Sequence, residues 1–413
     1  MRLKSVLIAL AVSMAWMAQL RCAIADTTPR SSDKPTLLVL LLDGARWDLL
    51  NAGLTPNLNR LAQAGAPGEM IPVWPSVSFP NHWALATGLY PIHGGIYHNG
   101  GHQETHLHGE PIWTTVSSQG GVSGVIGDWG GGTRASMLPP GPTFSLPYRP
   151  KNDDYSQAAE LIVPLLDQDE AKRPQLVAMH FMEPDVSQHL HGVGSPETNT
   201  IVQQIDQMIG DLVSRLRARG LSGEVNILVV ADHGQTNRRN TDTIYFLEDF
   251  VDRDDLATPL AAGGPDPVAF LLPRKDREDA VYTQLSHAGL HLHVFRSSDI
   301  PARWHCCDFG LESPLIVTTD PGSWVSERAF QGTGVIGSHG FDNAFRDMHA
   351  LFIAAGPAIK AGVHVKPFEN VDLYSLMAAI LRVSPAKTDG SIQPLCSILV
   401  DAPPSCVSHF LKP

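Results

Sequence analysis

Runs of apolar, often β-branched residues alternate with amphipathic segments along most of the chain. Buried parallel strands read as continuous apolar runs, and amphipathic stretches between them are typical of covering helices. The pattern therefore predicts an α/β fold, with a central, mostly parallel sheet flanked by helices. Three runs are expected to be strands of that sheet: 36–42, 175–181 and 225–231.

An acidic residue follows each of these three predicted strands. Asp43 and Asp232 come directly after the first and the third, and Asp185 comes shortly after the second. Ligands of open α/β sheets bind at the carboxyl ends of the strands. Each acid alone has an equally good explanation as a helix cap or turn residue. Three acids at one edge, one of them followed by His233, indicate a metal site instead.

The spacing of nearby histidines adds to this prediction. Asp185 and His189 stand at i and i+4, so they share one face if a helical turn begins there. Carboxylate and imidazole ligands without thiolates suit zinc in an open catalytic site. Manganese or another divalent ion is compatible with the same ligand types.

The N-terminal segment has the pattern of a secretory signal peptide. Two basic residues precede the apolar run 6–16, and a small-residue Ala-Ile-Ala sequence ends at Ala25. We therefore expect residues 1–25 to be a signal peptide and residues 26–413 to form the folded domain. A membrane anchor is the alternative, but the run is short for a bilayer span. The expected location is the periplasm or the exterior of the cell.

The charge of the chain limits its partners. Acidic residues number 42 and basic residues 30, a formal net charge of −12. Loss of the predicted signal peptide would remove three more basic residues, Arg2, Lys4 and Arg21. Such a chain has no general attraction to nucleic acid polymers or anionic membranes. A small-molecule substrate is expected, and the oligomeric state stays open.

Four cysteines follow the predicted signal peptide. In an oxidising compartment they could form disulfides. Cys396 and Cys406 are the plausible local pair. The adjacent Cys306 and Cys307 do not bond to each other easily, and their pairing is open.

A serine lies at the start of another predicted element. Pro80 is tolerated in the first turn of a helix, which could continue to Thr87. Ser78 would then lie at a helix N-terminus, where backbone N–H groups favour an anion. An ordinary capping serine is the alternative. A serine hydrolase triad is a weaker alternative, because no Gly-x-Ser-x-Gly sequence surrounds Ser78.

Five segments match, in order and in internal spacing, the motifs of one enzyme family. They are Leu41-Leu42-Asp43-Gly44-Ala45-Arg46-Trp47; Ser78-Phe79-Pro80-Asn81-His82, extended by Thr87-Gly88-Leu89-Tyr90-Pro91 and His93-Gly94 up to Asn99; Glu183-Pro184-Asp185-Val186-Ser187-Gln188-His189; Asp232-His233-Gly234; and Gly337-Ser338-His339-Gly340-Phe341-Asp342-Asn343. The chain resembles the nucleotide pyrophosphatase/phosphodiesterases of the alkaline phosphatase superfamily. The resemblance spans residues 38–357 and implies an alkaline phosphatase-like sheet.

The resemblance implies a two-zinc hydrolase of phosphodiester or phosphoanhydride bonds. Ser78 would be the nucleophile and would form a covalent phosphate ester. Asn99 would donate a hydrogen bond to a phosphoryl oxygen, helped by the amide of Phe79. The implied ligands of one zinc are Asp43, Asp232, His233 and the Ser78 oxygen, and those of the other are Asp185, His189 and His339.

Two departures from the family pattern concern the substrate. The family usually has threonine where this chain has Ser78, although members that cleave lysophospholipids and choline esters have serine. Nucleotide-cleaving relatives carry a base-stacking tyrosine at the position of His180. The resemblance thus implies that Phe79 and His180 bind the substrate, with a smaller stacking surface at His180.

Other functions of the same fold stay open at this point. The alternatives are a phosphate monoesterase, a phosphonate hydrolase, and a glycerophosphodiester or lysophospholipid phosphodiesterase. An inactive binding module is less consistent, because all the implied ligands and the nucleophile are present. Residues 240–335 carry no family motif and are expected to form a cap or insertion within the domain.

Overall fold

The computed structural model describes residues 34–99, 107–129, 141–150, 154–238, 243–257, 267–307, 314–328 and 335–406. The predicted signal peptide lies outside these residues, so its prediction stands as it was made. In the part of the chain that is described, no helix has both the length and the apolar character that a membrane crossing requires.

An eight-stranded sheet forms the centre of the molecule, in the order β15-β2-β14-β6-β1-β5-β3-β4. Pairing is parallel from β6 through β1, β5 and β3 to β4, whereas β14 is antiparallel to both of its neighbours. The predicted α/β class with a mostly parallel sheet is confirmed. The strands are β1 (Thr36–Leu42), β2 (Ala66–Ile71), β3 (Ser123–Ile126), β4 (Phe144–Leu146), β5 (Leu176–Phe181), β6 (Val225–Val230), β14 (Ala350–Ala355) and β15 (Phe368–Glu369).

The three strands expected from the apolar runs lie side by side. Strand β1 is central, with β5 on one side and β6 on the other, and all three are buried along their whole length. Because they are parallel neighbours, their carboxyl ends meet at one edge. The sequence therefore predicted both the strands and the edge that carries the acids.

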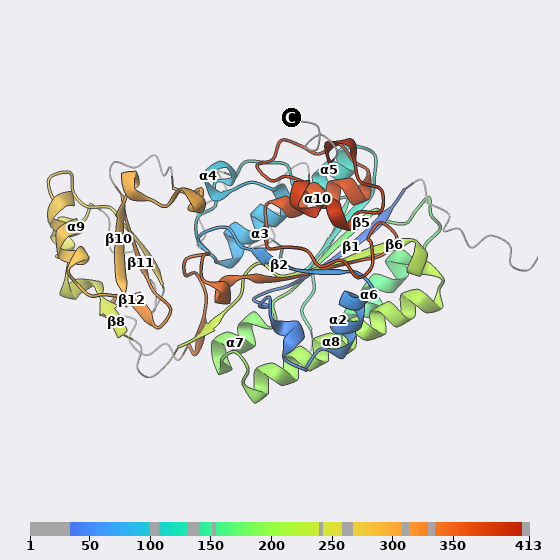
Figure 1. Cartoon of the computed structure of the whole chain (residues 1–413), viewed down its shortest axis with the longest axis horizontal. Helices are drawn as coiled ribbons and strands as arrows, with labels where there is room; N and C mark the ends of the chain where they lie inside the picture. The colour runs from blue at the N-terminus through green and yellow to red at the C-terminus, as the bar shows by residue number, and fades with distance from the viewer. Residues whose placement is uncertain are drawn as a thin grey trace, which may run out of the picture.

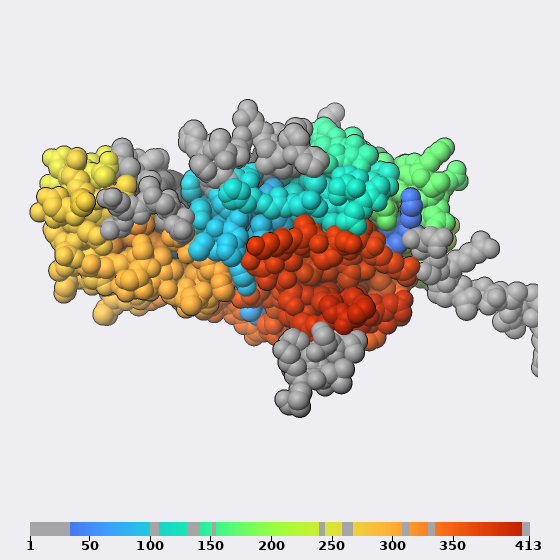
Figure 2. All heavy atoms as spheres, turned by 90° about the horizontal axis from the view of Figure 1, so that it is seen from above, coloured from blue at the N-terminus to red at the C-terminus, as the bar shows by residue number. Residues whose placement is uncertain are grey.

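Helices cover both faces of the sheet (Figure 1). One layer contains α2 (Pro56–Gln63), α6 (Ser156–Leu166) and the long α8 (Pro196–Ala218). The other contains α3 (Ser78–Thr87), α5 (Ile112–Ser118) and α10 (Asp372–Leu381), with the short α4 (Pro91–Gly94) beside α3. Figure 2 shows α10 and the residues after it covering a broad part of one face.

The described residues between 243 and 328 build a separate unit at one end of the molecule, which we call the cap (Figures 1 and 2). Its strands are β8 (Thr243–Phe246), β9 (Val268–Leu271), β10 (Leu292–Arg296), β11 (Leu315–Thr319) and β12 (Ser323–Ser326), and its helix is α9 (Glu278–Ser286). It has its own apolar cluster around Leu247, Leu285 and Val317. That the cap lines a substrate pocket stays a prediction.

Aromatic stacking attaches the cap to the core. The Trp304 ring, in the short 3-10 helix η7 (Ala302–Trp304), stacks on Trp74 with centroids 4.0 Å apart and planes 8° apart. Next to it, His305 stacks on Tyr90 at 4.0 Å. Trp74 lies only a few residues before Ser78, so this attachment adjoins the serine motif.

One disulfide agrees with the expected pairing. Cys396 and Cys406 are bonded, as the local spacing predicted. The sulfur atoms of Cys306 and Cys307 meet at a turn with a positive φ of 88° at Cys307, and the pairing of these two cysteines stays open.

Helix α2 begins with a cap that comes from another helix. Thr55, at the N-cap position, makes no side-chain cap hydrogen bond. Instead Asp206 of α8, which is 2% exposed, accepts hydrogen bonds from the backbone of Asn57 at 3.0 Å and of Leu58 at 2.8 Å. This carboxylate satisfies N–H groups that a helix start otherwise leaves without partners.

We expect Asp206→Ala to lower the free energy of unfolding by about 2–4 kcal/mol, because it leaves buried amides of α2 unsatisfied. The matched control is Asp211→Ala on the same helix, which removes an exposed ion pair with Arg215. That control should cost less than about 0.5 kcal/mol. Urea unfolding of both variants measures the difference, and equal losses would contradict the assigned capping role.

Candidate metal centre

Three carboxylates gather at the carboxyl edge of β5, β1 and β6. Asp43 directly follows β1, Asp232 lies just beyond β6, and Asp185 is the first residue of α7 (Asp185–His191). The Asp185 amide donates to the Asp43 carbonyl at 3.0 Å, which holds the first turn of α7 against the end of β1. Asp43 and Asp232 are buried, with exposed fractions of 6% and 0%. The structure thus brings the three predicted acids together.

One group of ligand atoms comes from α7 and from the loop after β13 (Gly337–Ser338). His189 Nε2 lies 3.3 Å from Asp185 Oδ2 and 3.2 Å from His339 Nε2. His339 Nε2 lies 3.5 Å from Asp185 Oδ1. Strand β13 pairs with β7 (Thr236–Asn237), which brings the His339 loop beside the Asp232 segment.

A second group lies directly beside the first. His233 Nε2 is 3.1 Å from Asp232 Oδ2 and 3.6 Å from Asp43 Oδ1. Ser78 Oγ is 3.2 Å from the same nitrogen. The His233 ring stacks on the His339 ring with centroids 3.7 Å apart, so the two groups are adjacent.

These distances fit divalent metal ions. A tetrahedral ion with bonds of about 2.0–2.1 Å separates its ligand atoms by roughly 3.3 Å. The contacts above lie between 3.1 and 3.6 Å. Moreover, Asp43 Oδ1 is buried and accepts no hydrogen bond from the described residues. A buried carboxylate oxygen without a donor is expensive unless a cation binds it.

The hydrogen bonds of three histidines determine which ring nitrogen faces the two groups of candidate metal ligands. His189 Nδ1 contacts the Gly337 carbonyl at 2.8 Å, and His339 Nδ1 contacts that of Ser76 at 3.0 Å. His233 Nδ1 lies 3.0 Å from the Gly234 carbonyl. A carbonyl only accepts, so each Nδ1 carries the hydrogen. Each Nε2 therefore presents a lone pair, as a metal ligand requires.

Among the pKa shifts, that of His339 agrees with a neutral ring, whereas those of His189 and Asp232 arise from contacts between acids and protonated histidines. Burial, together with the charge of His233, lowers the pKa of His339 to about 3, so its ring is neutral. Burial also acts to lower the pKa of His189, but its contact with Asp185 outweighs this effect and raises that pKa. Burial acts to raise the pKa of Asp232, yet the positive charge of neighbouring histidines holds it well below the ordinary value.

Ser78 is the first residue of α3, and Val77 is the N-cap. The alternative of an ordinary capping serine is therefore wrong: Ser78 Oγ faces His233 instead of the helix start. The side chain is 8% exposed.

Asn99 lies next to the serine motif, and its side chain is hydrogen-bonded to the Phe79 backbone amide, which was expected to help bind the substrate. The Phe79 backbone N–H donates to Asn99 Oδ1 at 2.9 Å. This bond orients the Asn99 side chain, leaving Nδ2 to donate elsewhere. The expectation that the Phe79 amide contacts a phosphoryl oxygen differs from the structure, because that N–H is already engaged. The Phe79 ring packs beside Trp83 and Ile96.

His180 has a position different from the one expected of a base-stacking residue. It is 5% exposed, and its Nε2 lies 3.0 Å from Asp43 Oδ2. Its ring meets the His82 ring edge-on, with centroids 4.8 Å apart. The substrate-binding role predicted for His180 is not supported, because the ring contacts a candidate metal ligand and is buried behind it.

Sequence reasoning missed three other residues of the site. His82 Nε2 lies 3.1 Å from Asp232 Oδ2 and 3.5 Å from Asp43 Oδ2. Burial acts to lower the pKa of His82, but these two carboxylates raise it to about 10. The remaining two are Gln235 and Gly44.

Gln235 and Gly44 donate hydrogen bonds to two of the acids, Asp185 and Asp232. Gln235 Nε2 donates to Asp185 Oδ1 at 2.7 Å, and the Gly44 amide donates to Asp232 Oδ1 at 3.0 Å. Gly44 has a φ of 70°, and a Cβ there would lie 3.0 Å from the Asp185 side chain. Only glycine fits this close approach. All three missed residues stand inside or beside quoted motifs, which was the available signal.

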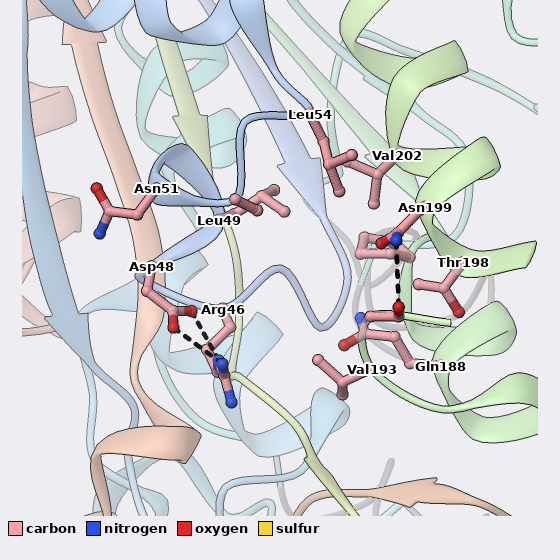
Figure 3. Close-up of a pocket in the computed structure, with 13 residues that line it drawn as sticks. Arg46, Asp48, Leu49, Asn51, Leu54, Gln188, Val193, Thr198, Asn199 and Val202 are labelled. Atoms are coloured by element: carbon pink, nitrogen blue, oxygen red, sulfur yellow. Dashed lines mark hydrogen bonds and ion pairs between the residues drawn. The ribbon is translucent and has the colours of Figure 1, made fainter. Parts of the chain in front are cut away.

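A separate cavity of about 260 Å³ lies behind α7 (Figure 3). Its lining includes Pro184 and Gln188 but none of the candidate metal ligands. Arg46, the cation in this lining, is bonded to Asp48 at 2.7 Å, and Asn199 is bonded to the Gly194 carbonyl. The cavity is therefore not an extension of the metal groups.

Comparisons with known proteins agree with this geometry. Residues 37–342 match the family model described as type I phosphodiesterase / nucleotide pyrophosphatase. The chain is 27% identical to human ectonucleotide pyrophosphatase/phosphodiesterase family member 5, over 94% of this chain and 83% of that protein. It is 31% identical to an uncharacterized pyrophosphatase/phosphodiesterase of Schizosaccharomyces pombe, over 87% of this chain and 79% of that protein.

A solved structure has the same fold. It is an inactive variant of murine ectonucleotide pyrophosphatase/phosphodiesterase 5 in complex with AMP, with a TM-score of 0.78 and 26% identity. The match covers 89% of this chain and 100% of that chain. The chain described here therefore belongs to the type I phosphodiesterase / nucleotide pyrophosphatase family, whose members are hydrolases acting on phosphodiester bonds.

Proposed function

We propose that this phosphodiesterase uses Ser78 as its nucleophile and holds two zinc ions in the adjacent groups described above. The observation that carries the proposal is the position of Ser78 Oγ, 3.2 Å from His233 Nε2 and at the start of α3. One ion would be held by Asp43, Asp232, His233 and Ser78. The other would be held by Asp185, His189 and His339.

When bound, the ions supply positive charge that favours ionisation of the serine hydroxyl and neutralises the phosphoryl oxygens. Ser78 Oγ forms a bond to phosphorus while the bond to the ester oxygen of the leaving group breaks. The product is a covalent seryl phosphate ester. Water then attacks the phosphorus, the Ser78–phosphorus bond breaks, and the serine takes back a proton.

Asn99 contributes the donor that this chain supplies to the phosphoryl group. Its Oδ1 is held by the Phe79 amide, so its Nδ2 is oriented before substrate arrives. A donor oriented in advance is more effective in the transition state than one that must reorganise. Phe79 forms the apolar side of the site with Trp83.

Charge supports a diester in preference to a monoester. The sequence has no Lys or Arg between Arg60 and Arg134. Among the described residues, no Lys or Arg forms an ion pair with a candidate metal ligand. The cap residue Arg303 is paired with Asp342 instead. In the part of the chain that the structure describes, no Lys or Arg is therefore paired with the site in a way that would favour a second negative charge on the phosphoryl group.

Small nucleotide esters or pyrophosphates are the proposed substrates, because the murine relative binds AMP in its structure.

We also propose that the protein acts outside the cytoplasm. The disulfide between Cys396 and Cys406 supports an oxidising compartment.

Ser78→Ala should lower kcat by about 10⁴-fold or more, because it removes the hydroxyl that lies against His233. Zinc content should stay near that of the wild type, since the carboxylate and imidazole ligands remain. Ser78→Thr keeps the attacking oxygen and should retain most of the activity. Rapid-quench detection of a covalent phosphoprotein gives an independent check, and wild-type turnover by the Ala variant would exclude Ser78 as nucleophile.

Chelation should abolish hydrolysis of bis(nitrophenyl) phosphate, and added Zn²⁺ should restore it. The reason is that the clustered acids and histidines form a ligand set, and the bound ions supply the charge that activates Ser78. Metal analysis of the chelated protein accompanies the assay. Full activity of protein that contains no metal would refute the metal-dependent mechanism.

The ratio of kcat/KM for a nitrophenyl diester to that for the matched monoester should be well above one at the same pH. Introducing a cation should shift this ratio, and Asn99→Lys is the informative variant because it replaces the neutral donor. We expect it to lose diester activity and to narrow the preference. A wild-type monoester preference would instead favour a phosphatase.

A further inference from the structure

The two histidines that sequence reasoning did not assign to the metals contact the candidate ligands from behind. His180 Nε2 lies 3.0 Å from Asp43 Oδ2, and His82 Nε2 lies 3.5 Å from the same oxygen. His82 Nε2 also lies 3.1 Å from Asp232 Oδ2. Both rings are buried, with exposed fractions of 5% and 1%. They belong to different elements, β5 and α3.

His180 is hydrogen-bonded to Asp43, whose ionised carboxylate only accepts, so His180 carries hydrogen on Nε2. His82 Nε2 lies within ion-pair distance of both Asp43 and Asp232. The three candidate metal-binding histidines instead have backbone carbonyls as partners of Nδ1, which leaves Nε2 to face the acids and the ion.

The two oxygens of Asp43 consequently differ. Oδ2 contacts His180 and His82, whereas Oδ1 accepts no hydrogen bond from the described residues and lies 3.6 Å from His233 Nε2. Only Oδ1 is directed at the metal group. A carboxylate that is free to rotate would exchange its two oxygens or bind through both.

We propose that His180 and His82 are positioning residues, which hold Asp43 so that a single oxygen, Oδ1, faces the metal. His82 has a second partner, Asp232, and so ties together the acids at the ends of β1 and β6. These adjacent carboxylates repel each other, and a ring that contacts both keeps them at the separation that one ion requires. The inference rests on the metal-dependent function proposed above. It adds that metal affinity depends on two residues that do not touch the ion.

The test measures zinc binding directly, in the full chain, by competition with a chromophoric chelator. His180→Ala and His82→Ala should each lower the zinc affinity by about 10–100-fold, as loss of a hydrogen bond to a metal ligand does. His180→Gln and His82→Gln should recover part of the loss, since the amide nitrogen of glutamine lies close to the position of Nε2. Visible spectra of the cobalt-substituted proteins should change in the Ala variants and move back toward wild type in the Gln variants.

Asn226→Ala is the matched control. Asn226 is also buried, at 1% exposure, and bonds the Thr36 carbonyl and the Ala358 amide. It lies in β6 at the end opposite Asp232. This variant should lower the thermal stability but leave zinc affinity and the cobalt spectrum unchanged, which separates a general loss of packing from a loss of positioning.

The possible results separate the inference from the function on which it rests. Wild-type zinc affinity and an unchanged cobalt spectrum in folded His180→Ala and His82→Ala would overturn the positioning role alone. The positioning role would also be overturned if the wild type bound three zinc ions per chain and an Ala variant bound two. The histidines would then be ligands of the third ion. Absence of zinc binding by the wild type would instead overturn the proposed metal centre. The Gln variants keep the test valid if either Ala variant does not fold.

Discussion

The rest of the structure depends on the concentration of negative charge at one edge of the sheet. Asp43 and Asp232 are almost completely buried and stand at the ends of adjacent strands, with Asp185 close by. Burial and the charge of Asp232 both act to raise the pKa of Asp43, but contacts with His180 and His82 outweigh them and lower it. The apolar strands supply the fixed frame that makes this arrangement possible, since β1, β5 and β6 are buried throughout. Cationic partners are therefore a structural requirement as well as a catalytic one.

The sequence predicted the parts that depend on local pattern. Continuous apolar runs end at Asp43 and just before Asp232, so strand assignment and the common edge followed from periodicity and the geometry of parallel sheets. The helix expected after Ser78 is present as α3. The family motifs correctly brought His339, remote in the sequence, into contact with His189. No local pattern would have joined those two residues.

What the sequence did not predict depends on side-chain direction. His180 lies in a strand where successive side chains alternate between faces, but its partner, Asp43, comes from the neighbouring strand. A pairing of that kind follows from the register between strands, which the sequence of one strand does not contain. His82 and Phe79 lie in α3, and their contacts with Asp232 and Asn99 depend on how this helix packs against the sheet and the following loop. The cap was likewise expected only as a region without motifs, because its small sheets pack around their own cluster.

The position of hydrogen on four histidines connects the fold to the chemistry. Backbone carbonyls of Ser76, Gly234 and Gly337 select one tautomer of the candidate ligands, and these carbonyls belong to the loops that the motifs specify. The Asp43 carboxylate selects the opposite tautomer of His180. A histidine that exchanged these roles would place a hydrogen where a cation must bind, or leave a buried carboxylate oxygen without a donor. The motif residues are therefore constrained in pairs, because each ligand needs the group that fixes the position of its proton. This pairing explains why the motifs extend beyond the ligands themselves.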